Sequence, residues 1–212
     1  MQSSNKNIQI PEMTTFENSM GPYILHSHIE DSFAKKLYEE GKKIPKKNDA
    51  SKFLASRIKK VRKYNIEEWL TKGLLPYINK WIDGWNKFSK NNYYPPNAVL
   101  KSIWINFQNA GETNAEHSHP NADLSFVIYL KIPETISNNY KNFLSNPSHT
   151  GAPPGSIFFK YGEYQRLAVD GRVICPTEKS ILMWPGYLRH GVQPFTCEGI
   201  RISVAGNISF LD

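Results

Sequence analysis

The chain has 212 residues, of which 40% are hydrophobic, 13% aromatic and 21% charged, and its formal net charge is +7. This composition allows a packed core and excludes a globally disordered chain, and no segment approaches the roughly 20 consecutive apolar residues of a membrane span. The two cysteines, Cys175 and Cys197, form no CxxC pair, which excludes a disulfide framework and makes a reducing cytoplasm the expected location.

The first part of the chain is predicted to be largely helical. After a polar arm over residues 1–20, aromatic and branched residues at 22–29 predict a strand. A helix is predicted from 31 to 41 and, after a lysine-rich loop at 44–49, a second helix from 50 to 64.

The strongest helical pattern follows Asn65, which is the predicted N-cap. Glu67 and Glu68 fall in the predicted first turn, where the helix dipole favours carboxylates. Pro76 is expected to kink or divide this helix. Apolar side chains recur at helical spacing and indicate a buried face: Trp69, Leu70, Leu74, Tyr77, Ile78, Trp81, Ile82 and Trp85.

Much of the excess positive charge lies between Lys42 and Lys63. A solvated helix face is the simplest interpretation of such runs. The alternative is a basic patch that binds nucleic acid or an acidic partner. The sequence leaves both interpretations open.

After Pro95-Pro96 the pattern changes to short strands separated by Gly, Pro and Asn, which is typical of a sandwich or barrel. A long polar stretch at 133–155 is predicted to be a flap over the site. We therefore expect an N-terminal arm and helical support over 1–96 and a β core over 97–212, together forming one compact domain. The predicted strands are 100–107, 124–130, 156–160, 172–175, 180–184, around 190–192, and 200–205.

Three histidines of the predicted β core could share one site. His117 and His119 are separated by one residue, so their side chains share a face if both lie on a regular strand. His190 follows a Pro-Gly turn that would direct it back toward them. Three imidazoles with open positions suit iron, copper, nickel or zinc.

Arg201 follows on the next predicted strand, and Ser203 shares its face. A guanidinium and a hydroxyl together can bind a carboxylate. The histidines and Arg201 thus suggest a metal that acts on an anionic small molecule.

Five short segments carry a resemblance to a known family. Over residues 102–210 the chain resembles the 2-oxoglutarate/Fe(II)-dependent oxygenases, and most of all the subgroup with an H-x-H-P motif found in bacteria and marine phages. That resemblance implies a mainly β fold with N-terminal helices, in which a double-stranded β-helix core, of the jelly-roll or cupin-like type, is supported by α-helices. The matching segments are Trp104-Ile105-Asn106, His117-Ser118-His119-Pro120-Asn121, Ser125 to Leu130, Trp184-Pro185-Gly186 through His190, and Arg201-Ile202-Ser203 with Asn207.

The resemblance implies Fe(II), 2-oxoglutarate and O2, with His117 as the first metal ligand and His190 as the last. The family usually has a carboxylate where this chain has His119, so a neutral imidazole would replace an anion. His119 is the favoured second ligand. Asp123 or Glu116 could supply a carboxylate instead, and a site without functional iron is the remaining alternative.

By the same resemblance, Arg201 would bind the distal carboxylate of 2-oxoglutarate with the support of Ser203. Asn106 and Tyr129 are candidates for further contacts with the co-substrate, the alternative for each being a hydrogen-bonded polar group of the barrel interior. The implied reaction is hydroxylation of a substrate with release of succinate and CO2. A peptide side chain, a nucleobase, a small metabolite or a sugar would fit as substrate.

Two other classes of function stay open at the level of sequence. One is a three-histidine cupin-type metal dioxygenase that does not use 2-oxoglutarate. The other is a non-catalytic β-sandwich binding module with a degenerate site. The Lys- and Asn-rich composition would suit a phage, in which case the location would be the host cytoplasm.

Overall fold

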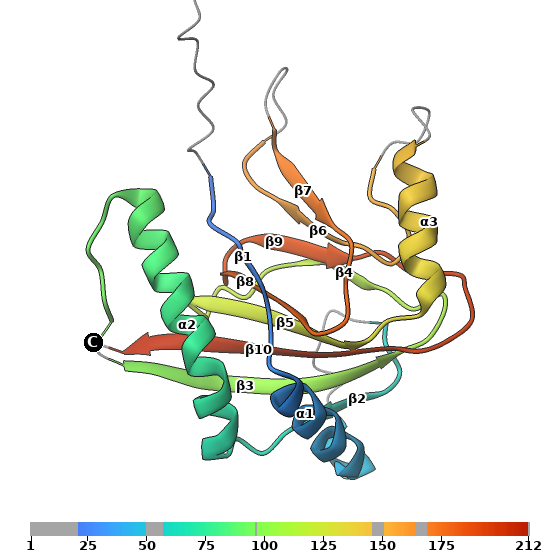
Figure 1. Cartoon of the computed structure of the whole chain (residues 1–212), viewed down its shortest axis with the longest axis horizontal. Coiled ribbons are helices and arrows are strands. Elements are labelled where there is room, and N and C mark those ends of the chain that lie inside the picture. The colour runs from blue at the N-terminus through green and yellow to red at the C-terminus, as the bar shows by residue number, and fades with distance from the viewer. Residues whose placement is uncertain (1–20, 50–56, 96, 146–150, 164–168, 212) are drawn as a thin grey trace, which may run out of the picture.

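The computed structural model describes residues 21–49, 57–95, 97–145, 151–163 and 169–211. They form two antiparallel sheets that face each other, with helices against one outer face (Figure 1). The mainly β fold with N-terminal helices is therefore confirmed.

The larger sheet has the strand order β1-β8-β5-β10-β3-β2, and the smaller one the order β4-β9-β6-β7. Every strand pair is antiparallel. The strands of the larger sheet are β1 (Leu25–His28), β8 (Ser180–Pro185), β5 (Leu124–Lys131), β10 (Arg201–Leu211), β3 (Asn97–Gln108) and β2 (Val61–Lys63). Those of the smaller sheet are β4 (Asn114–His117), β9 (Arg189–Val192), β6 (Ile157–Lys160) and β7 (Gly171–Ile174).

The helices α1 (Asp31–Lys43) and α2 (Glu68–Ser89) cover the outer face of the larger sheet. Their apolar stripes meet strand residues such as Ile103 and Ile105 in one continuous core. α2 begins at Glu68 with Glu67 as its N-cap, so the predicted cap at Asn65 was wrong by two residues. Pro76 lies within α2 without ending it. The buried apolar side chains of the helix continue on both sides of this proline, and their packing keeps the helix in one piece.

The predicted helix over 50–64 was wrong in its described part. Residues 50–56 lie outside the described residues, and Val61–Lys63 form the edge strand β2. Pairing with β3 overrides the local helical pattern, since Val61 lies opposite Asn106 and is fully buried. The short 3-10 helix η1 (Lys46–Asn48) lies in the predicted lysine-rich loop.

The segment 133–155 differs from the predicted flap loop, because α3 (Glu134–Ser145) occupies most of its described part. Residues 146–150 lie outside the described residues. The helix has an amphipathic sequence, and its Ile136 is 1% exposed. The isoleucine packs close to Gly155, whose φ of +76° and close neighbours leave no room for a side chain.

Both edges of the larger sheet, β1 and β2, come from the chain before residue 96. The first half of the chain thus contributes strands to the sheet as well as helices. The proposed division at residues 96 and 97 stays a prediction. No helix of the described residues is long and apolar enough to cross a membrane.

A second apolar layer lies between the two sheets, with members that include Tyr129, Trp184, Ile157 and Phe159. Successive side chains of β3 point alternately toward the helices and toward the space between the sheets. Ile103, Ile105 and Phe107 belong to the core under the helices, whereas Trp104, Asn106 and Gln108 line a pocket between the sheets. This pocket holds the candidate site.

Candidate metal and co-substrate site

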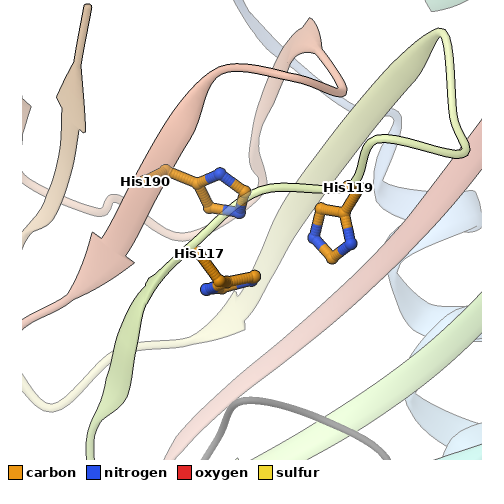
Figure 2. Close-up of side chains that lie close together, drawn as sticks. All are labelled: His117, His119 and His190. Atoms are coloured by element: carbon orange, nitrogen blue, oxygen red, sulfur yellow. The ribbon is translucent and has the colours of Figure 1, made fainter.

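Three imidazoles converge at the pocket from two strands and a turn. His117 ends β4 and lies opposite His190 on β9. The ligand atoms of His117, His119 and His190 all lie within 4.8 Å of one another. Ring centroids are separated by 4.4 Å for His117 and His190, 4.9 Å for His117 and His119, and 5.3 Å for His119 and His190. Figure 2 shows the three rings turned toward a common space.

His119 reaches the cluster from a turn, because β4 ends at His117. The expectation of one regular strand carrying both histidines was therefore wrong. The His119 amide donates to the Gly186 carbonyl at 2.7 Å, and the Gly186 amide donates to the Asp123 carbonyl at 2.9 Å. A Cβ at Gly186 would lie 2.2 Å from the Ala122 oxygen and 2.7 Å from the His119 oxygen. Close backbone approach at a glycine thus docks the turn that carries His119.

Backbone carbonyls orient two of the imidazoles. Nδ1 of His117 lies 2.7 Å from the Ala115 carbonyl oxygen, and Nδ1 of His190 lies 2.8 Å from that of Leu188. A carbonyl only accepts, so each Nδ1 carries a proton, and Nε2 is the nitrogen of each ring that can bind a metal.

Burial keeps the inner histidines neutral. Desolvation, reinforced by His117, lowers the pKa of His119 to about 4. Desolvation is also the main cause that lowers the pKa of His190 to about 3, with smaller contributions from the two other histidines. At neutral pH both rings are therefore in the form that binds metals.

Neither candidate carboxylate belongs to the cluster. Asp123 accepts a hydrogen bond from the Phe210 amide at 2.8 Å. Glu116 forms ion pairs with Arg189 at 3.4 Å and with Lys160 at 3.8 Å. Among the described residues, the only group of three or more potential metal ligands is the histidine trio. Its three imidazole nitrogen donors fit Fe(II).

Arg201 is buried at the same pocket with neutral partners. It is 2% exposed, and it donates to the Gly155 carbonyl at 2.6 Å and to the side-chain oxygen of Gln108. Its Nε and the Tyr129 hydroxyl have no hydrogen-bond partner among the described residues. Burial lowers the pKa of Arg201 and raises the pKa of Tyr129 to about 12. A buried cation with neutral neighbours is a place for an anion.

One pocket brings together the three favoured metal ligands and the four candidate co-substrate contacts, but not Asp123 or Glu116. It is lined by the three histidines and by Arg201, Ser203, Asn106 and Tyr129. Asn106 and Ser203 are cross-strand neighbours, with the Asn106 amide nitrogen 3.4 Å from the Ser203 hydroxyl.

Sequence reasoning missed Gln108, Asn114 and Trp184, which also line the pocket. The Asn114 side-chain oxygen and the Trp184 indole nitrogen are buried, with no partner among the described residues. The position of Gln108 could have been predicted, because it lies two residues after Asn106 on the same strand and therefore shares its face.

Residues 102–207, half of the chain, match the family described as "Putative 2OG-Fe(II) oxygenase". The chain belongs to the 2OG-Fe(II) oxygenase family. This oxygenase is accordingly an oxidoreductase that uses Fe(II), 2-oxoglutarate and O2. The family match favours neither the three-histidine cupin-type enzyme nor the non-catalytic module.

Solved structures share the fold of the oxygenase. An oxidoreductase of the 2OG-Fe(II) oxygenase family from Burkholderia pseudomallei matches with a TM-score of 0.57 and 12% identity, over 89% of this chain and 84% of that one. The viral collagen prolyl hydroxylase of Paramecium Bursaria Chlorella virus-1, in complex with 2OG, gives 0.56 and 13%, over 90% and 98%.

HygX from Streptomyces hygroscopicus, with nickel and 2-oxoglutarate bound, matches the oxygenase with a TM-score of 0.51 and 11% identity, over 88% of this chain and 82% of that one. At such identities the likeness concerns the fold, which is the double-stranded β-helix of these neighbours. A search among curated proteins found no match to the oxygenase.

Proposed function

We propose that the oxygenase hydroxylates a C–H bond of its substrate while converting 2-oxoglutarate to succinate and CO2. The observation that carries this proposal is one pocket lined both by three convergent histidines and by a buried arginine without a described acidic partner. In each turnover one oxygen atom of O2 would go to the substrate and the other to succinate.

In this proposal His117, His119 and His190 hold Fe(II). The ion supplies the redox chemistry with O2 that amino-acid side chains lack. The protein contributes geometry and exclusion of water: Trp184 packs against His190 with ring centroids 4.7 Å apart, and Phe159 packs against Trp184 at 5.1 Å. Three imidazole ligands would leave the bound ion with one more positive charge than two imidazoles and a carboxylate would.

Arg201 is proposed to bind the distal carboxylate of 2-oxoglutarate. Its unpartnered Nε and the Tyr129 hydroxyl offer donors to an anion in a place shielded from water, where charge-assisted hydrogen bonds are strong. Ser203 would add a hydroxyl, and Asn106, which lies beside Ser203, would hold that hydroxyl in place.

Binding and turnover can be tested separately. Calorimetry without O2, on protein loaded with Fe(II), should show 2-oxoglutarate binding, and aerobic incubation should release succinate. Arg201→Ala should abolish 2-oxoglutarate binding while the metal content is unchanged, and Arg201→Lys is the matched variant that keeps the charge. Failure of the metal-loaded wild type to bind 2-oxoglutarate would refute the proposal in favour of a metal enzyme of another kind. Absence of stoichiometric metal in protein purified without O2 would favour a binding module.

Nucleic acid stays a predicted partner through the segment 42–63. Part of its charge is neutralised, because Lys42 and Lys43 pair with neighbouring glutamates and Arg62 is buried against Asp49. Exposed cations remain around β2, among them Lys59, Lys60 and Lys63. Affinity for single-stranded DNA that falls steeply with salt would support this role. Affinity that does not change with salt would contradict it.

A further inference from the structure

Gln108 lies next to Arg201, and both residues line the pocket. The two residues are direct cross-strand neighbours on β3 and β10, and the Gln108 side chain is almost fully buried at 1% exposure. Its amide oxygen accepts a hydrogen bond from Arg201, and its amide nitrogen donates to the Glu112 carbonyl at 2.5 Å. The side chain is thus held from both sides.

Only a side chain that accepts on one side and donates on the other satisfies both neighbours. A glutamate would form an ion pair with Arg201 and would turn an oxygen toward the Glu112 carbonyl. A hydrocarbon side chain would leave a guanidinium N–H and a carbonyl oxygen buried without partners, which is costly. An amide of this length fits both contacts and adds no charge.

Glu112, which accepts the hydrogen bond from the Gln108 amide nitrogen, is itself held in place. The Glu112 side chain is 8% exposed, and its carboxylate accepts from the backbone amides of Asn109 at 2.9 Å and Lys59 at 3.2 Å. The acid is therefore engaged by backbone N–H groups, and only its main-chain carbonyl meets Gln108. The turn after β3 and the segment beside β2 are joined at this point.

The charge of Arg201 is left uncompensated by this arrangement. Among the described residues its hydrogen-bond acceptors are the Gly155 carbonyl and the Gln108 amide, and no described carboxylate lies within ion-pair distance of it. A neutral acceptor orients the Arg201 guanidinium and leaves its positive charge uncompensated, whereas an anionic acceptor would also neutralise that charge.

We propose that Gln108 is a positioning residue that gives the pocket its preference for a dicarboxylate over a monocarboxylate keto acid. It holds the Arg201 guanidinium in place through a neutral amide, so that the full positive charge is available to the distal carboxylate of the co-substrate. This inference rests on the proposed function, in which Arg201 receives that carboxylate.

The test compares two ligands of equal chain length. 2-Oxovalerate carries a methyl group where 2-oxoglutarate has its distal carboxylate. Affinities for both are measured by calorimetry without O2 on protein loaded with Ni(II), for the wild type, Gln108→Glu and Gln108→Met. The charge-matched control is Asn91→Asp, an exposed position just beyond α2 that does not line the pocket.

Gln108→Glu is expected to weaken 2-oxoglutarate binding more than about tenfold, since its carboxylate competes for Arg201. Binding of 2-oxovalerate should change less than about threefold, so the preference for the dicarboxylate collapses. Gln108→Met, which keeps the volume and adds no charge, should reduce the preference by about threefold to tenfold, as expected for loss of the hydrogen bond that Gln108 accepts from Arg201. Asn91→Asp should leave both affinities unchanged.

If Gln108 had a merely structural role, its substitution would weaken the binding of both ligands alike, and that result would overturn the inference. An unchanged preference in Gln108→Met would also overturn it, even if Gln108→Glu failed to fold. Failure of the wild type to bind 2-oxoglutarate would instead contradict the proposed function itself. The two failures are therefore distinguishable.

Discussion

Replacing Gly186 with alanine is expected to displace the turn that carries His119. The new Cβ would lie 2.2 Å from the Ala122 oxygen and 2.7 Å from the His119 oxygen, and backbone atoms cannot yield as the end of a side chain can. Relief of these contacts would break the hydrogen bonds from the His119 amide at 2.7 Å and from the Gly186 amide at 2.9 Å.

The expected cost follows from those contacts. Two lost hydrogen bonds at about 1 kcal/mol each, together with about 1 kcal/mol for local overpacking, predict a fall of about 3 kcal/mol in the free energy of unfolding. Because His119 would leave the cluster, affinity for a divalent metal should fall by about 10- to 100-fold.

Urea unfolding of the metal-free protein and titration with Co(II) measure the two effects. Gly162→Ala is the control, since a Cβ there meets nothing within 4 Å and only the positive φ of +72° is penalised. That variant should lose about 1 kcal/mol and keep its affinity for Co(II). Equal stability losses in the two variants, with unchanged Co(II) titrations, would refute the reasoning.

Three further predictions concern the same pocket. Arg201→Ala should raise the Kd for 2-oxoglutarate by more than about 100-fold, because the charge-assisted bonds are lost, while the Co(II) titration stays the same. His119→Ala should weaken Co(II) binding by more than about tenfold, and His119→Asp should restore it in part. The metal-free protein should lose stability in acid, because the pKa of His190 is about 3 when folded and about 6.5 when unfolded. The unfolded chain then binds more protons below pH 6.5, which predicts a loss of about 2 kcal/mol by pH 5 from this residue, measured by urea unfolding at pH 8, 6.5 and 5.

Each of these predictions has a contrary outcome. Tight 2-oxoglutarate binding by Arg201→Ala would place the distal carboxylate elsewhere. Full Co(II) affinity in His119→Ala would show that two histidines hold the metal. If His190→Asn has the same acid sensitivity as the wild type, another group is responsible for it.

The strands of the second half and the order of the site residues could be predicted, because period-two alternation and short motifs are local properties. The edge strand β2 could not, since Val61 is strand-like only through its pairing with β3. Helix α3 was missed because asparagines and serines make its sequence largely polar, and among its described side chains only Ile136 is buried.

The sequence predicted which three histidines form the cluster, but not how the chain brings them together. His119 depends on the docking of a turn against Gly186, a tertiary contact that no strand pattern encodes. Gln108 was missed although alternation placed it on the pocket face, because its importance comes from the register that sets it opposite Arg201. Contacts between segments distant in sequence are the part that local reasoning cannot supply.

The irregular pairing of β4 with β9 has a consequence for the chemistry of the site. From Asn114 to His117 the strand β4 advances three residues, whereas β9 advances only two, from Val192 to His190. A ladder without the extra residue would set Glu116 opposite His190 and turn His117 to the outer face. β4 therefore carries both a carboxylate, Glu116, and an imidazole, His117. The one extra residue in its pairing with β9 determines which of the two side chains lies opposite His190.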